Sequence, residues 1–68
     1  MEKVRAKSKS GVIFRIYDDA PQWGGLFTIE YQRSYNAGMF HAWLRDENYK
    51  ATTNYTECYA HFLAIINS

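Results

Sequence analysis

Two histidines and one cysteine are the residues of this chain with the widest range of chemistry. Cys58 and His61 stand three residues apart, which would place both side chains on one turn of a helix. A zinc site needs three or four ligands, and no further Cys or His pair completes one. Cys58 also falls among apolar residues, as a buried structural cysteine does. We expect no metal, no cofactor and a core role for Cys58.

His41 is the better candidate for proton transfer. On an alternating strand it shares one face with Trp43 and Arg45. A histidine with Glu30 or Arg45 nearby could act as a general acid or base, although the same residues could equally form a mixed polar face. No glycine-rich phosphate loop, carboxylate pair or Ser–His–Asp set accompanies it, and so small a core leaves little room for a pocket. We therefore expect that the protein is not an enzyme.

Aromatic residues and arginines form the most distinctive set. Aromatic residues are 18% of the chain, and tyrosine, the most frequent, combines a large contact area with a polar end. Tyrosine, tryptophan and arginine are also enriched at the centres of protein interfaces. Alternatively, some of these rings wrap round the sheet and complete a small core. The candidate binding residues are Arg15, Tyr17, Trp23, His41, Trp43 and Arg45.

Three segments with the pattern of β-strands would position these side chains. Residues 12–17 are β-branched and aromatic, residues 26–33 alternate apolar with polar, and residues 39–45 follow as a third strand. In the third strand a shift of one residue would exchange the two faces. The residues expected to face the core are Val12, Phe14 and Ile16 of the first strand, Phe27, Ile29 and Tyr31 of the second, and Phe40, Ala42 and Leu44 of the third. The residues of the third strand are expected to lie under the helix.

Turn residues separate these strands. Pro21 and the glycine pair that follows exclude a regular element from residues 18–25. Residues 34–38 are a hairpin loop in which Asn36 or Gly38 takes the left-handed conformation.

A helix is expected over residues 54–67, after a polar connection at 46–53. Asn54 is suited to the N-cap, and Glu57 three residues later completes a capping-box pattern. The apolar positions fall on one side of the helix, which a sheet can cover. They are Tyr55, Cys58, Tyr59, Phe62, Leu63, Ile65 and Ile66.

Positive charge is concentrated near the N-terminus. Residues 1–15 hold five cations against one acid, whereas residues 16–68 hold three cations against six acids. Residues 3–8 alternate charged with small side chains, as a protected edge strand does. The alternative for residues 1–10 is a basic arm that contacts phosphates or an acidic partner. Its residues would be Lys3, Arg5, Lys7 and Lys9.

Together these elements predict one α+β domain over residues 1–68. It is an antiparallel meander of three to four strands (β-β-β-β-α, with the meander at 12–46) and one C-terminal amphipathic helix on one face. Over residues 12–67 the element order resembles, in topology alone, the plant AP2 domain and the arm-binding domains of phage-type integrases. That resemblance implies DNA binding by Arg-rich outward strand faces, whereas this chain offers Arg15 and Arg45 among Thr28, Glu30 and Gln32.

Composition restricts the setting of the protein. A hydrophobic content of 47% excludes disorder, and a single cysteine excludes an internal disulfide. No apolar run marks a signal peptide or reaches the 18 residues that a membrane span needs. We expect a cytoplasmic protein without a membrane partner.

Two functions fit these observations. The first is a non-catalytic protein-binding module that inhibits or modulates a larger partner, as small anti-CRISPR or anti-restriction proteins of phages and plasmids do. Its contact set would be the aromatic and arginine residues, with Asp18 and Asp19 at the rim. The alternative is nucleic-acid binding by the aromatic sheet face and the basic arm. A homodimer that buries two uncovered sheet faces is compatible with either.

Overall fold

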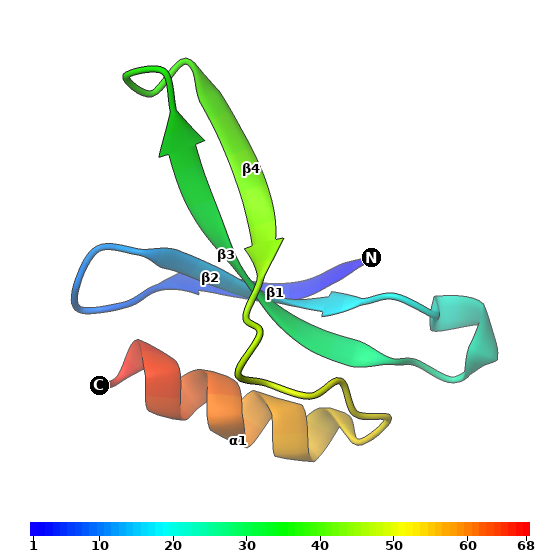
Figure 1. The fold of residues 1–68 in the computed structure, drawn as a ribbon. Helices are drawn as coiled ribbons and strands as arrows, with labels where there is room; N and C mark the ends of the chain where they lie inside the picture. The colour runs from blue at the N-terminus through cyan, green and yellow to red at the C-terminus, as the bar shows by residue number, and fades with distance from the viewer.

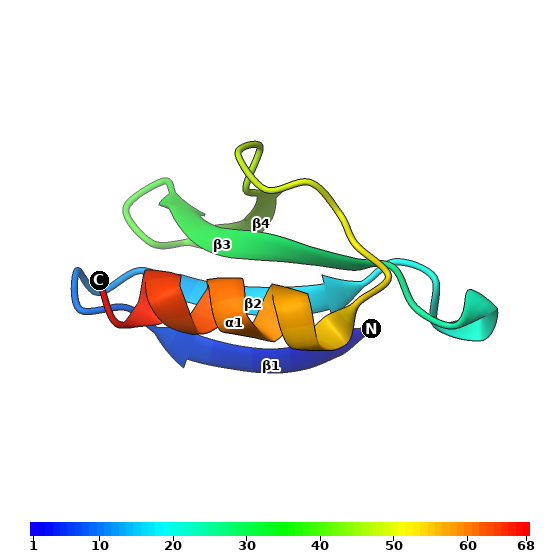
Figure 2. The same cartoon turned by 90° about the horizontal axis from the view of Figure 1, so that it is seen from below.

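Four strands follow one another along the chain and pair in the same order in space, each antiparallel to the next (Figure 1). The computed structural model describes residues 1–68, and the single long helix lies across one face of the sheet (Figure 2). The predicted α+β meander with a C-terminal helix is therefore confirmed. The elements are β1 (Glu2–Lys7), β2 (Ile13–Asp18), β3 (Phe27–Tyr35), β4 (Phe40–Arg45) and α1 (Tyr55–Ile66).

The core lies between α1 and the two central strands. Ile16 of β2 and Ile29 of β3 are opposite each other in the sheet, and both are fully buried. Phe27, Cys58 and Phe62 complete this cluster from β3 and α1. The alternation of apolar and polar residues thus assigns the inward faces of β2 and β3 correctly, and Cys58 has the core position that the sequence predicts.

The start of α1 is fixed by two hydrogen bonds. Asn54 Oδ1 accepts from the Glu57 backbone N–H at 3.1 Å, as a capping residue does. The reciprocal half of the predicted capping box does not form, because the Asn54 N–H is donated to Thr52 Oγ1 at 3.1 Å instead. Thr52 is held in place by its own two backbone hydrogen bonds with Phe27, which tie this part of the chain to β3 immediately before the helix.

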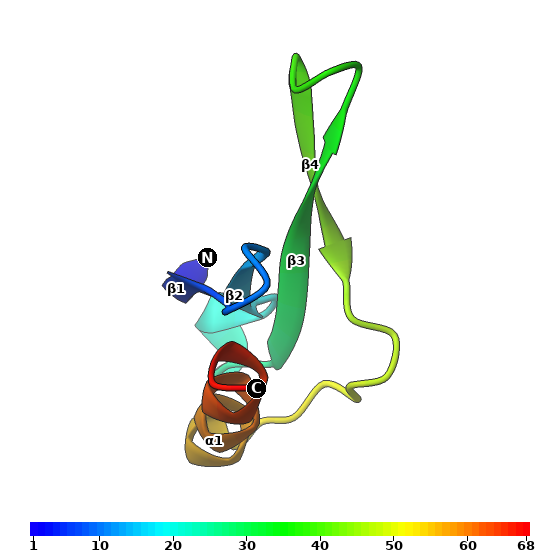
Figure 3. The ribbon, with the colours of Figure 1, turned by 90° about the vertical axis from the view of Figure 1, so that its left-hand side faces the viewer.

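The β3–β4 hairpin extends beyond the other strands and beyond the helix (Figures 1 and 3). β2 pairs with β3 only as far as Tyr31, so the outer part of the hairpin is a two-stranded ribbon. Leu44 is opposite Tyr31 and Phe40 is opposite Tyr35, which places the even-numbered residues of β4 on the helix side of the sheet. The prediction that Phe40, Ala42 and Leu44 lie under the helix is nevertheless wrong. α1 packs on β2 and β3, none of the three residues belongs to the core or packs against it, and Phe40 is 60% exposed.

The β2–β3 and β3–β4 connections differ in detail from the sequence predictions. In the hairpin loop Asn36, Ala37 and Gly38 all have positive φ, where one left-handed residue was expected. Between β2 and β3, Pro21 begins a single 3₁₀ turn (Pro21–Trp23) in a segment expected to have no regular element. A proline fits this position because its fixed φ suits the first residue of a helical turn.

Candidate functional site

Arg15 lies at the centre of the outer sheet face, the face opposite the helix. Its guanidinium carbon is 4.0 Å from the centre of the Trp43 ring and 4.6 Å from the centre of the Tyr17 ring. Arg5 of β1 covers the same indole ring at 5.1 Å. Trp43 therefore lies on the outer face as the strand register predicts, but it is half-buried beneath two guanidinium groups.

Two carboxylates complete this group of side chains, which we call the Arg15 layer. Arg15 Nε donates to Glu30 Oε1 at 2.7 Å, and its Nη1 donates to Glu2 Oε1 at 3.2 Å. Arg5 Nη2 binds the same Glu2 oxygen at 2.6 Å, and this hydrogen bond is the main reason that the pKa of Glu2 is lowered. The side chains of Arg15 and Glu30 are only 15% and 14% exposed, so water screens their interaction less than that of a surface pair.

The outer face is thus covered by its own side chains. Arg45, the third arginine of this face, also has an acidic partner, since its Nη2 donates to Asp19 Oδ2 at 2.7 Å. Charges that were expected to meet a partner are therefore already paired within the chain. The guanidinium–ring contacts and the ion pairs lie on the face that a face-to-face homodimer would bury.

His41 lies outside the Arg15 layer. Its Nδ1 is hydrogen-bonded to Ser34 Oγ at 3.0 Å, on the exposed part of the hairpin. Glu30, which was expected as a catalytic neighbour, is occupied by Arg15. The arrangement brings no carboxylate to the imidazole.

The N-terminal cations are divided between two roles. Residues Glu2–Lys7 form β1, an edge strand of the sheet, so the segment is not a free arm. Arg5 belongs to the Arg15 layer, whereas Lys3, Lys7 and Lys9 are exposed and form no ion pair. The lysines are consistent with protection of an exposed sheet edge.

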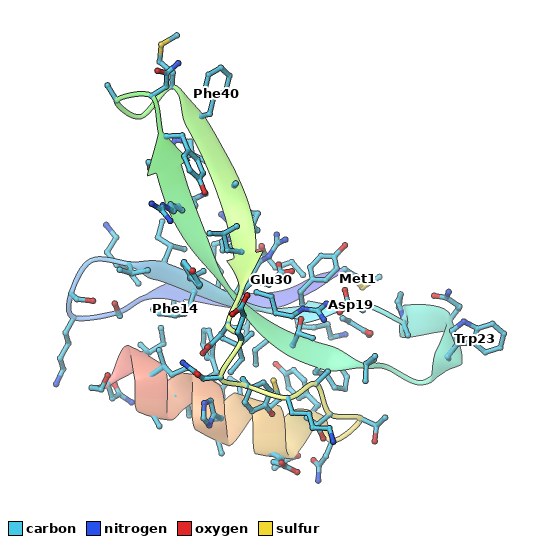
Figure 4. The ribbon with its side chains drawn as sticks, viewed as in Figure 1. Met1, Phe14, Asp19, Trp23, Glu30 and Phe40 are labelled. Atoms are coloured by element: carbon cyan, nitrogen blue, oxygen red, sulfur yellow. The ribbon has the colours of Figure 1, made fainter.

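Trp23 is the most exposed large apolar residue, at 81% of its surface, and it extends into solvent well away from Phe40 of the hairpin (Figure 4). The turn that carries it is nevertheless well fixed. The N–H groups of Trp23 and Gly25 are both donated to the Ala20 carbonyl at 3.0 Å, and the Asp19 N–H is donated to Leu26 O at 2.9 Å. The sequence identified Trp23 only as an aromatic residue beside glycines. It did not predict that the turn holding the indole would be fixed.

The side chain of Asp18 also holds this turn in place by hydrogen bonds. It is 4% exposed rather than at a surface rim, which corrects the sequence expectation. Its Oδ1 accepts hydrogen bonds from the N–H of Ala20 at 2.9 Å and of Leu26 at 3.0 Å. Burial opposes ionisation, but these two hydrogen bonds, together with the positive charges of Lys3 and the N-terminus, lower the pKa of Asp18 below its ordinary value. An aspartate two residues before a turn N–H is the signal that could have predicted this role.

The lowered pKa of Asp18 predicts a pH-dependent stability. The folded protein binds this proton less readily than the unfolded chain, so the carboxylate stabilises the fold above the unfolded pKa of about 3.9. The stabilisation is lost as the pH falls through the lower folded pKa. We expect the wild type to have a higher Tm than Asp18→Asn at neutral pH, and the two Tm values to converge in acid. A difference that stays constant across a thermal-denaturation pH series would contradict this.

The cysteine and the second histidine lie on either side of Tyr49. Cys58 is fully buried, and this burial raises the pKa of its thiol, which disfavours the nucleophilic thiolate. The Tyr49 hydroxyl is buried without a hydrogen-bonding partner, and burial together with the adjacent thiol raises the pKa of Tyr49 to about 12. His61 packs on the Tyr49 ring, with 4.6 Å between the ring centres, and is otherwise exposed. Cys58 and Tyr49 therefore belong to the packed interior, and His61 covers the ring of Tyr49 at its surface.

The hairpin tip is a surface that sequence reasoning missed. Tyr35, Met39 and Phe40 are exposed by 42%, 76% and 60%, and Figure 4 shows Phe40 far from the body of the molecule. Strict alternation had placed Phe40 in the core. Element lengths were the available signal: a helix of 12 residues is about 18 Å long, whereas the nine residues of β3 extend about 30 Å.

No family model, no curated protein and no solved structure matches this chain. α1 lacks the length and apolar character that a helix needs to cross a bilayer.

Proposed function

We propose that this chain is a non-catalytic protein-binding module that inhibits or modulates a larger partner by stoichiometric binding. The observation that carries the proposal is Trp23, which is 81% exposed on a turn held by backbone hydrogen bonds and by Asp18. Tryptophan is among the residues that contribute most to protein interfaces. Holding it in place before binding reduces the entropy that association costs. Trp23 is therefore the proposed anchor of the contact.

The lining of the one hollow in the structure does not include the candidate histidine, His41. This hollow lies between the end of β4 and the turn that follows it. It contains no histidine or cysteine, and its lining residues are Tyr31, Leu44, Arg45, Asp46, Glu47 and Asn48. Small inhibitors of host defence encoded by phages and plasmids are the class of protein that this proposal favours, because they act by occupying a larger protein.

Nucleic-acid binding is the alternative. The ion pairs of Arg5, Arg15 and Arg45 weigh against it, because phosphate contacts would have to replace existing carboxylate contacts. The exposed lysines of the first strand remain available. A low-salt gel-shift titration with single-stranded DNA, duplex DNA and RNA tests it, and binding that weakens steeply with added salt would favour this alternative.

Trp23→Ala is expected to weaken partner binding strongly without changing the fold. The side chain contacts little within the chain, so the free energy of unfolding should change by no more than about 0.5 kcal/mol. Loss of an interface anchor weakens binding by about 2 kcal/mol or more, which is on the order of 30-fold. The immobilised wild type, Trp23→Ala and the comparably exposed control Met39→Ala are compared for stoichiometric capture from a lysate of the encoding cell. A partner that Trp23→Ala retains at wild-type level would contradict the proposal.

A further inference from the structure

The two edges of the sheet are built differently. β1, at one edge, carries lysines and a break in register between Glu2 and Val4, two devices that keep an edge strand from pairing with another chain. β4, at the other edge, has neither a lysine nor a proline nor a register break over Phe40–Arg45. The edge of β4 is thus open to pairing.

The hydrogen-bond pattern shows which backbone groups of β4 are free. The Asp46 N–H is donated to the Ile29 carbonyl at 2.8 Å, which makes these two residues a hydrogen-bonded pair. Such pairs alternate along an antiparallel ladder, so the even-numbered residues of β4 direct their N–H and C=O groups to β3. The N–H and C=O groups of His41, Trp43 and Arg45 therefore point to the open edge.

The hairpin also has apolar surface that nothing in the chain covers. Its outer part is only two strands wide, and an isolated two-stranded ribbon is at best marginally stable in water. Phe40, 60% exposed, lies on the helix side of this ribbon, with half-buried Leu44 further along the same face. A third strand beside β4 would cover both.

We propose that β4 pairs antiparallel with β4 of a second copy of this chain, about a two-fold axis at Ala42. In this register Phe40 is opposite the partner's Leu44, and Ala42 is opposite the partner's Ala42, so apolar side chains meet on the helix side. On the outer face His41 is opposite the partner's Trp43. The strand is chemically self-complementary about its third residue, which is what an isologous contact requires.

Two neighbouring registers also keep both faces matched, and both are less favourable. With the axis at His41, Leu44 would be opposite the partner's Gly38, outside the strand. With the axis at Trp43, Phe40 would be opposite the carboxylate of the partner's Asp46. Ala42 is therefore the centre that the side-chain chemistry favours.

The test combines the mass in solution with two designed variants. His41→Pro removes an N–H at the open edge and leaves the β3–β4 hydrogen bonds in place, as proline does on edge strands. Ala42→Cys places two thiols at a non-hydrogen-bonded pair on the axis, where Cα atoms are about 4.5 Å apart and a disulfide can form. Ala64→Cys, on the exposed side of α1, is the matched control, and the native Cys58 is fully buried in each variant.

Light scattering across a dilution series is expected to give the mass of two chains for the wild type and of one chain for His41→Pro, with the same circular dichroism spectrum. Ala42→Cys is expected to form a reducible two-chain product on oxidation, and Ala64→Cys is not. A wild type of one chain throughout, a two-chain His41→Pro, or an Ala42→Cys protein that does not cross-link would each overturn the proposal. Trp23 lies on a separate projection of the molecule, away from Phe40 and the hairpin, so these results are independent of partner capture (Figure 4).

Discussion

Phe62→Ala is expected to leave the protein largely unfolded at room temperature. Phe62 is 1% exposed and is the largest fully buried side chain of a core that has only five buried apolar residues. Truncation of a buried phenylalanine costs about 3–5 kcal/mol. A single core in a domain of this size supplies about 3–5 kcal/mol in total, so the loss is comparable with the whole stability.

Urea denaturation followed by circular dichroism measures this effect. Leu63→Ala, the next residue along the helix, is the control because its side chain is 38% exposed. It should destabilise by no more than about 1 kcal/mol, the centre of the range for ordinary substitutions. A cooperative Phe62→Ala transition with a midpoint near that of the wild type would show that the core lies elsewhere.

Arg15→Ala is expected to destabilise the protein by about 2 kcal/mol, although arginine is usually a surface residue. The substitution removes a guanidinium from between two aromatic rings and leaves Glu30, only 14% exposed, without its partner. Cation–π contacts shielded from water contribute about 1–2 kcal/mol, and an unpaired, mostly buried carboxylate adds to the loss.

Arg5→Ala is the matched control for Arg15→Ala, because it removes the same charge from a more exposed position. Arg5 also contacts Trp43 and Glu2, but its side chain is 50% exposed, so its removal should cost less than about 1 kcal/mol. The free energies of unfolding of both variants are obtained from urea titrations at one ionic strength. Equal losses for the two arginines would mean that the Arg15 layer is an ordinary set of surface pairs.

The sequence by itself determined the elements and the inward faces of the central strands. A period of two in β2 and β3 and an amphipathic pattern in α1 are local properties, because each depends on neighbours within a few residues. They predicted the burial of Ile16, Ile29 and Phe62 without knowledge of the partner element. The N-cap at Asn54 is local for the same reason.

Only the tertiary structure decided which of the candidate binding residues meet one another and which remain free. Arg15 and Trp43 are 28 positions apart and come into contact because β2 and β4 both flank β3, while Trp23 stays in water because no element crosses its turn. Phe40 alternates as a core residue does, yet it is exposed because α1 packs on β2 and β3 and does not reach the outer part of the hairpin. Contacts of this kind depend on where separate elements lie and end relative to one another. A repeating local pattern in the sequence carries no information about those positions.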